Sequence, residues 1–415
     1  MTATSTTPPE APPTAASEAQ GLERLTGYSR SLQSSEGGGA VPRAARRGRP
    51  RLVTSYAKDQ ALLDTPAKRW WTLAALVVAL AAPFVLAPDL TMLVSMAMVF
   101  AIAGIGLNLL TGYAGQISLG HPFFMALGAY TAAVVGGVPG STVWGREMDL
   151  AIALPLAAIV PALVGLVVAP LAVRVRGLYL AVLTLGLLMI GEHLFKQWAS
   201  LTGGEGVGRG VAEPVLVGSD LGVKYAVGPL IIDEDISLYL ICLVLLVVLG
   251  VMARNIARSR TGRAFAAVRD RDIAAEVMGV NLLRTKTLAF VLSSAYAGIA
   301  GALMSLLVGR IVPEQWNIFL SIQILAVIVI GGVATVTGSL IGAAFVVLLP
   351  RVLEDLAPRL PFIASGGQDG LLSVFQLQTI LFGAMIILFL TLEPRGLFGL
   401  WHRVRTYFTT WPFRY

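Results

Sequence analysis

The chain has 415 residues, of which 56% are apolar and 13% charged, whereas soluble domains carry about 25% charged residues. This composition excludes an ordinary soluble domain and predicts that most of the chain lies in lipid. The net charge of +7 would suit a nucleic-acid-binding protein, but the basic residues cluster around the ends of apolar segments, as membrane topology requires. The single cysteine, Cys242, lies in an apolar run and is expected to be a packing residue.

Residues 1–69 are dominated by Thr, Ser, Pro, Ala and Gly and are expected to form a disordered cytoplasmic tail. Five arginines fall between positions 43 and 51, and Arg47-Gly48-Arg49-Pro50 resembles the core of a DNA minor-groove-binding AT-hook. That motif is short and common. We favour the interpretation that this arginine cluster sets membrane topology and binds anionic lipid. Nucleic acid is not an expected partner. No signal-peptide pattern precedes Trp70, so the first apolar helix must act as an uncleaved targeting signal.

Apolar runs predict an all-α integral membrane protein, because a membrane-spanning helix needs about 20 residues. Glycine-rich segments border two of these runs, 117–136 and 338–352. The run 338–352 is short enough for a half-helix. The ten predicted segments, spanning or half-spanning, are 70–87, 90–110, 117–136, 150–173, 177–196, 236–253, 287–309, 319–337, 338–352 and 371–392.

The distribution of charge predicts the orientation of these segments. The loop 254–286 carries eight basic and three acidic residues and is assigned to the cytoplasm, whereas the loop 197–235 carries two basic and six acidic residues and is assigned outside. The N-terminal tail and residues 397–415, a basic C-terminal tail, are both assigned to the cytoplasm. Both termini then lie on one side, which requires an even number of crossings, and ten fits best.

The most informative stretch is 106–133, where an apolar helix breaks into polar and glycine residues and then resumes. Lipid cannot satisfy freed backbone groups, so such a break persists only where it is buried in protein or lines a wet path. We therefore predict a weakly polar substrate pathway here. Its predicted residues are Asn108, Thr111, Gly112, Gly115, Gln116, Ser118 and His121, of which His121 could equally serve only to start a helix.

The sequence GLNLLTGYAGQISLGH, residues 106–121, closely resembles a hallmark of permease subunits of branched-chain amino acid ABC importers, the LivM type. Two further stretches, GLYLAVLTLGL (177–187) and TGGEGVG (202–208), are similar to landmarks of that family. The resemblance covers about 90–396, so the domain is expected to be a polytopic permease over 70–396. The family's usual acidic-Gly-Leu ending is here Glu205-Gly206-Val207, which leaves the external docking surface open.

Residues 327–347, VIVIGGVATVTGSLIGAAFVV, repeat the pattern of an apolar run, a Gly/Thr/Ser break and a second apolar run. Paired breaks in two halves indicate a central pathway in transporters built from inverted repeats, and we extend that rule here by analogy. The alternative is that Gly331, Gly332, Gly338 and Gly342 only allow close helix packing. Both interpretations remain open at this point.

The cytoplasmic stretch 259–290 contains an amphipathic segment from Arg263 to Met278, and Gly279 follows where a helix end favours a left-handed residue. A short helix in a solvated loop is marginal alone, so we expect it to dock on a partner rather than rest on lipid. The segment resembles the EAA-type coupling loop of ABC permeases, which fits a groove on the ATP-hydrolysing subunit. The residues that match are Gly262, Arg263, Ala267, Arg269, Asp270, Ala275, Glu276 and Gly279.

No catalytic constellation is present in the sequence. No GxxxxGK[ST] phosphate loop occurs, and His121, His193 and His402 lack metal-ligand spacing, so no enzyme activity, metal or cofactor is expected in this chain. Glu192 and Lys196 are expected to pair across one helical turn. The apolar runs contain almost no ionisable residues, which disfavours a proton-coupled carrier.

The resemblance implies a bacterial inner-membrane permease that imports branched-chain or related amino acids. Its implied partners are an extracytoplasmic substrate-binding protein, a paralogous permease subunit and two ATP-binding subunits that hold ATP and Mg. A urea or amide importer is the alternative within this class. A stand-alone secondary carrier or channel is the alternative from another class, and it would not need the coupling loop.

Overall fold

The computed structural model describes residues 66–137, 143–175, 177–211, 215–216, 218–227, 230–356, 363–364, 372–393 and 395–410. All of them belong to one structural unit, 65–415. The predicted N-terminal tail up to residue 65, with its arginine cluster at 43–51, lies outside the described residues. The last five residues of the basic C-terminal segment also lie outside them.

Each of the ten predicted apolar segments contains a helix, which confirms the all-α class. The long helices are α3 (Pro66–Ala81), α4 (Pro88–Leu107), α5 (His121–Gly136), α6 (Leu150–Arg174), α7 (Leu178–Gln197), α9 (Glu234–Arg258), α12 (Leu282–Val308), α13 (Ile318–Gly331), α14 (Val336–Leu356) and α15 (Val374–Leu392). Shorter or peripheral helices are η2 (Ala82–Phe84), α8 (Ala199–Thr202), α10 (Arg260–Asp270), α11 (Asp272–Val277), η4 (Pro313–Gln315) and α16 (Gly396–Thr410).

Within the described ranges, six helical segments are long and apolar enough to cross a membrane, and a bent pair made of α15 and α16 would be a seventh. The run 338–352, which alone is short enough for a half-helix, belongs to a helix of spanning length, because α14 continues through Arg351 to Leu356. The short helices are instead α5, with 16 residues, and α13, with 14. Each of them borders a glycine-rich break. The prediction of ten crossings stays a prediction.

Helix α4 forms the centre of the fold and packs against α9, α12, α13 and α14. It is almost uniformly apolar, and its second half, from Met98 to Leu107, is buried throughout. Close approach of helices is achieved by glycine: a side chain at Gly104 would meet Val327 of α13. The free Cys242 is buried in α9, as predicted for a packing residue. The predicted pair of Lys196 and Glu192 is also present, at 3.0 Å.

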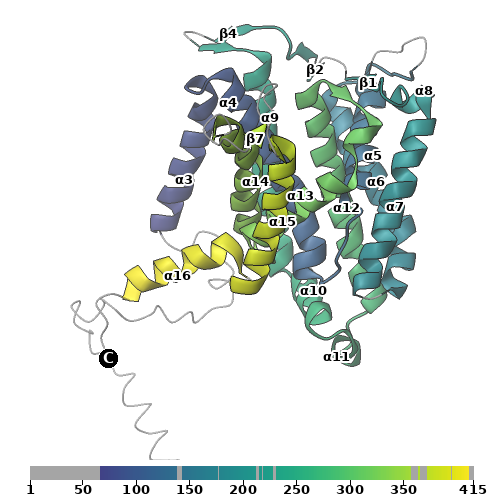
Figure 1. The fold of residues 1–415 in the computed structure, drawn as a ribbon, viewed down its shortest axis with the longest axis vertical. Coiled ribbons are helices and arrows are strands. Elements are labelled where there is room, and N and C mark those ends of the chain that lie inside the picture. The colour runs from purple at the N-terminus through teal and green to yellow at the C-terminus, as the bar shows by residue number, and fades with distance from the viewer. Residues whose placement is uncertain are drawn as a thin grey trace, which may run out of the picture. The chain divides into compact units, whose positions relative to one another are not determined.

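Short strands lie at the end of the bundle opposite residues 254–286 (Figure 1). The antiparallel pairs are β1 (Arg209–Gly210) with β6 (Arg310–Ile311), β2 (Val215–Leu216) with β3 (Ser219–Asp220), and β4 (Tyr225–Val227) with β5 (Leu230–Ile232). A parallel pair joins β7 (Ile363–Ala364) to β8 (Leu372–Ser373). In Figure 1 the strands β1, β2 and β4 lie at the top, whereas α10, α11 and α16 lie at the bottom. The two loops assigned to opposite sides of the membrane thus lie at opposite ends.

Candidate functional site

The first break, residues 108–120, is a wide helical turn followed by an irregular segment. Helix α4 ends in a π-helical turn, Asn108–Tyr113, a rare form that frequently occurs at functional sites. The turn is closed locally, because the Thr111 hydroxyl donates to the Gln116 carbonyl at 3.0 Å and the Gln116 amide donates to the Leu110 carbonyl at 3.0 Å. Gly115 has φ +71°, a conformation that costs a residue with a side chain. The break therefore needs its glycines and its hydroxyl to turn the chain.

Asn108 joins the first break to the second break, residues 331–335. Its side-chain amide donates to the Thr335 carbonyl and to the Ser339 hydroxyl, both at 2.9 Å. Its side-chain oxygen accepts from the Ala334 backbone amide at 2.7 Å. Because Asn108 is only 1% exposed, these bonds replace water that the site excludes. The two breaks, about 220 residues apart in the sequence, form one hydrogen-bonded unit.

The far side of the first break is tied to two further helices. The Leu119 amide donates to the Thr184 hydroxyl of α7 at 2.9 Å, and the Ser321 hydroxyl of α13 donates to the Leu119 carbonyl at 2.7 Å. The chain then enters α5 at His121, which confirms a helix-start position for that residue. The break is thus held between α4, α7, α13 and α14.

The coupling loop, residues 254–286, contains two helices rather than the single helix expected over Arg263–Met278. Helix α10 is capped by Ser259, whose hydroxyl accepts from Thr261 and Gly262, and it buries Phe265 and Val268. Arg271 is extended (φ −156°, ψ 103°) and separates α10 from α11. Helix α11 begins at Asp272, whose carboxylate accepts from the Ile273 amide at 2.9 Å. A side chain that bonds the backbone in this way favours the end of α10 at Arg271.

Arg269 connects the coupling loop to the first break. Its Nη1 donates to the Gly112 carbonyl at 3.0 Å, and its Nε pairs with Asp270 at 3.2 Å. A side chain at Gly115 would place its Cβ 2.7 Å from the Arg269 Cγ, which is closer than real Cβ atoms approach. The arginine therefore lies directly on the backbone of the break. The predicted pathway residues and the predicted coupling residues meet at this contact.

A polar cavity of about 240 Å³ lies beside this contact. Gly115, Gln116, Arg269 and Lys286 line it, and the Lys286 ammonium lies 3.7 Å from an Asp272 oxygen. Gln116 is 5% exposed, and its side-chain amide has no hydrogen-bond partner among the described residues. Of the seven predicted pathway residues, Gly115 and Gln116 line a described cavity.

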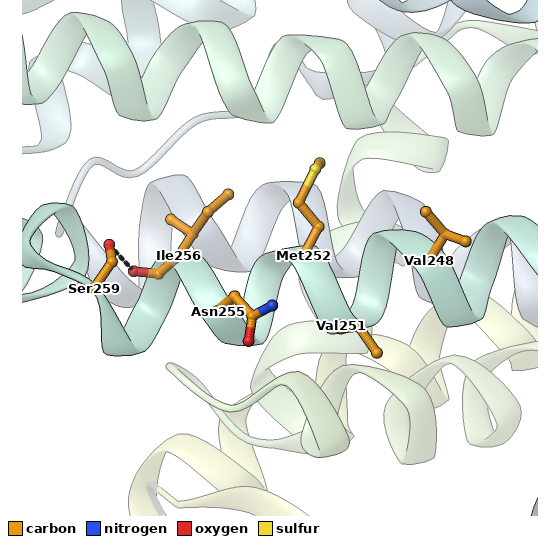
Figure 2. Close-up of a pocket in the computed structure, with 6 residues that line it drawn as sticks. All are labelled: Val248, Val251, Met252, Asn255, Ile256 and Ser259. Carbon is orange, nitrogen blue, oxygen red and sulfur yellow. Dashed lines mark hydrogen bonds between the residues drawn. The ribbon is translucent and has the colours of Figure 1, made fainter. Parts of the chain in front are cut away.

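A larger cavity, of about 410 Å³, lies along α9 (Figure 2). Five of its six lining residues come from this helix, and the sixth, Ser259, follows its last residue. Figure 2 shows that the Ser259 hydroxyl donates to the Ile256 carbonyl, a bond of 2.7 Å. The remaining lining is mainly apolar, with Val248, Val251 and Met252. None of the predicted site residues lies there, so this cavity is not part of the candidate site.

The structure places the other predicted residues as follows. Asn108, Gly112, Ser118 and His121 are buried, and Thr111 is partly buried. In the coupling loop, Gly262 and Ala275 are buried and Ala267 is partly buried; Arg263, Arg269, Asp270, Glu276 and Gly279 are exposed. Gly279 has φ +86°, as expected for the residue that ends α11. Their roles in a pathway or in coupling remain predictions.

Helix α11 presents apolar side chains to the outside of the chain. Ile273 is 67% exposed, Val277 82% and Met278 84%, in a segment that Figure 1 shows at the lower tip of the molecule. Ala275 packs inward on the opposite side. An apolar face that is exposed at a protruding tip is typical of a surface that binds another protein.

Arg209 is a structural residue that the sequence patterns did not reveal. It is 3% exposed and donates to the backbone carbonyls of Ala133 at 2.6 Å, Leu201 at 3.2 Å and Trp144. Burial lowers the pKa of its guanidinium. These bonds hold the end of α5 against the segment after α7. The only sequence signal is its position directly after the glycine-rich stretch 202–208.

Comparison with known proteins identifies the family. The model of a family described as branched-chain amino acid transport system / permease component matches residues 90–390. The chain belongs to this family. The resemblance to this family of permeases is confirmed, and the matched residues include both 106–121 and 259–290.

Two relatives match most of the permease. The high-affinity branched-chain amino acid transport system permease protein LivM of Salmonella typhimurium is 29% identical over 80% of this chain and 76% of its own length. LivM of Escherichia coli is 28% identical over the same shares. The autoinducer 2 import system permease protein LsrC of an Enterobacter species is 29% identical over 51% of this chain and 56% of its own. No solved structure matches the chain.

Proposed function

We propose that the permease forms the membrane path of an ABC importer for branched-chain or related amino acids. An external binding protein delivers the cargo, a paralogous permease completes the path, and two ATP-binding subunits supply ATP and Mg. The protein lies in a bacterial plasma membrane with both termini in the cytoplasm. The family match over 90–390 and the LivM relatives support this proposal.

The cargo is the part of this proposal that the relatives support least uniformly, because one relative is described as an autoinducer 2 importer. The importer reconstituted with its binding protein is expected to take up leucine with ATP on the cytoplasmic side. Uptake of urea or another small amide in its place would favour the alternative cargo. Uptake by the permease alone, without ATP-binding subunits, would instead identify a stand-alone carrier and refute the proposal.

The exposed apolar tip of the coupling loop is the observation that supports coupling most directly. Val277 and Met278 are more than four-fifths exposed in a segment that no described part of the chain covers. An ATP-binding subunit that covers this tip would exert force on α10, and Arg269 would pass that force to the Gly112 carbonyl. From there Asn108 links to the second break. Coupling then follows a continuous series of contacts from the docking surface to both breaks.

We expect that Val277→Glu, Met278→Glu, Glu276→Lys and Gly279→Pro each abolish uptake, because they place charge or strain on the docking tip. The permease should still insert and accumulate, since these side chains contribute nothing to its own core. The measurement is co-purification of the ATP-binding subunits beside uptake in vesicles.

Val207→Glu is the matched control for this series, because Val207 is 63% exposed in the loop at the opposite end. It should leave co-purification of the ATP-binding subunits unchanged. If all four coupling-loop variants retain both assembly and uptake, the loop does not couple transport.

A further inference from the structure

The basic segment after α15 is a regular helix with two different faces, α16 (Gly396–Thr410). Apolar residues recur three and four positions apart at Leu397, Leu400, Trp401, Val404 and Tyr407. Past the first turn this stripe is uncovered: Trp401 is 62% exposed, Val404 49% and Tyr407 55%. The opposite face carries polar residues.

The charge of α16 suits an anionic surface. The helix contains Arg403 and Arg405 and no acidic residue. On a helical projection the two arginines flank the apolar stripe, one on each side, and Arg405 lies where a long basic side chain reaches lipid headgroups. Arg403 is 71% exposed although it pairs with Glu393. Trp401 and Tyr407 are residue types that favour the membrane–water interface.

The position of α16 puts the stripe beside the membrane. The helix bends away from α15 by 46°, and Figure 1 shows it extending sideways at the end of the bundle that carries α10 and α11. Arg403 pairs with Glu393 at 2.7 Å across the bend. Leu397, the first residue of the stripe, packs against the hydrophobic core of the helix bundle. The same face therefore continues beyond the part that packs on the bundle, where Trp401, Val404 and Tyr407 are exposed.

The start of α16 lies on the second break. A side chain at Gly332 would place its Cβ 2.7 Å from the Arg395 carbonyl and 3.2 Å from the Phe398 Cβ. Gly396 has φ +62°, and a Cβ at this residue would lie 2.7 Å from the Gly332 nitrogen. Any restraint on α16 thus acts on the backbone of residues 331–332. Through Thr335 and Ala334 it reaches Asn108.

We propose that α16 lies in the cytoplasmic leaflet as an interfacial helix that binds anionic lipid and thereby fixes the second break. A helix of this type inserts its apolar face at the boundary between headgroups and acyl chains. The lipid contact makes transport depend on the charge of the membrane. This dependence rests on the proposed function, whereas the position of the helix does not.

The position is tested by spin labels at Trp401→Cys, Val404→Cys and Thr406→Cys in the full permease with its ATP-binding subunits, reconstituted in phosphatidylglycerol vesicles. Cys242 is 1% exposed and stays unlabelled. Oxygen should speed the relaxation of the spin labels at 401 and 404, and a water-soluble nickel chelate should not. The label at 406 should be relaxed by the chelate and not by oxygen. Equal exposure of all three to the chelate overturns the proposal. Protection of 401 and 404 that appears only with the ATP-binding subunits also overturns it.

The function of the contact is tested by uptake in phosphatidylglycerol and in pure phosphatidylcholine vesicles. The natural permease should lose activity in neutral vesicles, because each basic residue near an anionic surface contributes roughly a fivefold gain in binding. Trp401→Glu with Val404→Glu should reduce uptake in both membranes. Thr406→Glu adds charge on the opposite face and should not. Full uptake by the double variant refutes the functional role of the lipid contact, and so does uptake that is independent of lipid charge. Absence of uptake by the natural permease in both membranes would refute the proposed function instead.

Discussion

Asn108→Leu is expected to destabilise the permease by about 3 kcal/mol or more and to abolish uptake. The substitution leaves the Ala334 amide without its acceptor, which costs about 1–3 kcal/mol. It also removes the bonds that the Asn108 amide donates to the Thr335 carbonyl and the Ser339 hydroxyl, each worth about 1 kcal/mol, although the Thr335 carbonyl keeps its bond from the Ser339 amide. The substitution also separates the two breaks, because among the described residues every side-chain hydrogen bond between them involves Asn108. The measurement is thermal unfolding of the detergent-extracted permease beside uptake in vesicles.

Asn317→Leu is the matched control, since Asn317 is also an asparagine with bonds from both side-chain atoms. It caps α13 by accepting from the Leu320 amide at 3.2 Å and donates to the Glu314 carbonyl at 2.9 Å. These bonds are local, and loss of a helix cap costs about 1 kcal/mol. If Asn108→Leu destabilises no more than Asn317→Leu, the link between the breaks does not stabilise the fold.

Much of this site could be predicted from the sequence, because its signals are local. The change from apolar to glycine-rich residues at Asn108 predicted the break, and Gly279 predicted the end of the coupling helix. What the break contacts could not be predicted. Arg269 lies 157 residues from Gly112, and Thr335 lies 227 residues from Asn108, so no local pattern reveals these bonds. The structure consequently turns two separate motifs into one connected site.

The full length of α14 is hidden from local hydropathy for a physical reason. The run 338–352 looked too short because hydropathy falls at Arg351, yet polar residues are tolerated at a helix end that leaves the lipid, and α14 continues to Leu356. The charge of residues 397–415 predicts a basic tail, and the structure adds that this tail is helical up to Thr410. The three- and four-residue spacing of Leu397, Leu400, Trp401 and Val404 was present in the sequence and predicts the helix that the structure shows.

Gly115→Leu is expected to reduce uptake at least tenfold while costing the fold only about 1–2 kcal/mol from the left-handed backbone conformation. Gly115 has φ +71°, and its new side chain would meet Arg269, so the coupling loop must move away from the first break. Gly309→Leu is the matched control. Gly309 has φ +72° and nothing within 4 Å of its ideal Cβ, so this variant has the same backbone strain without the collision.

A double-mutant cycle with Arg269→Ala separates displacement of the coupling loop from obstruction of a pathway. Arg269→Ala alone removes the bond to the Gly112 carbonyl and should itself lower uptake. If Gly115→Leu acts by pushing Arg269 away, the two losses overlap and the double variant is no worse than the poorer single one. If leucine instead fills a path for the amino acid, the losses multiply, because the obstruction remains when the arginine is gone.

If residues 115–116 line such a path, Gln116→Leu, which removes the unpaired amide and keeps the volume, should lower uptake without lowering thermal stability. Multiplying losses would place residues 115–116 in the pathway, and overlapping losses would assign Gly115 to the contact that transmits force.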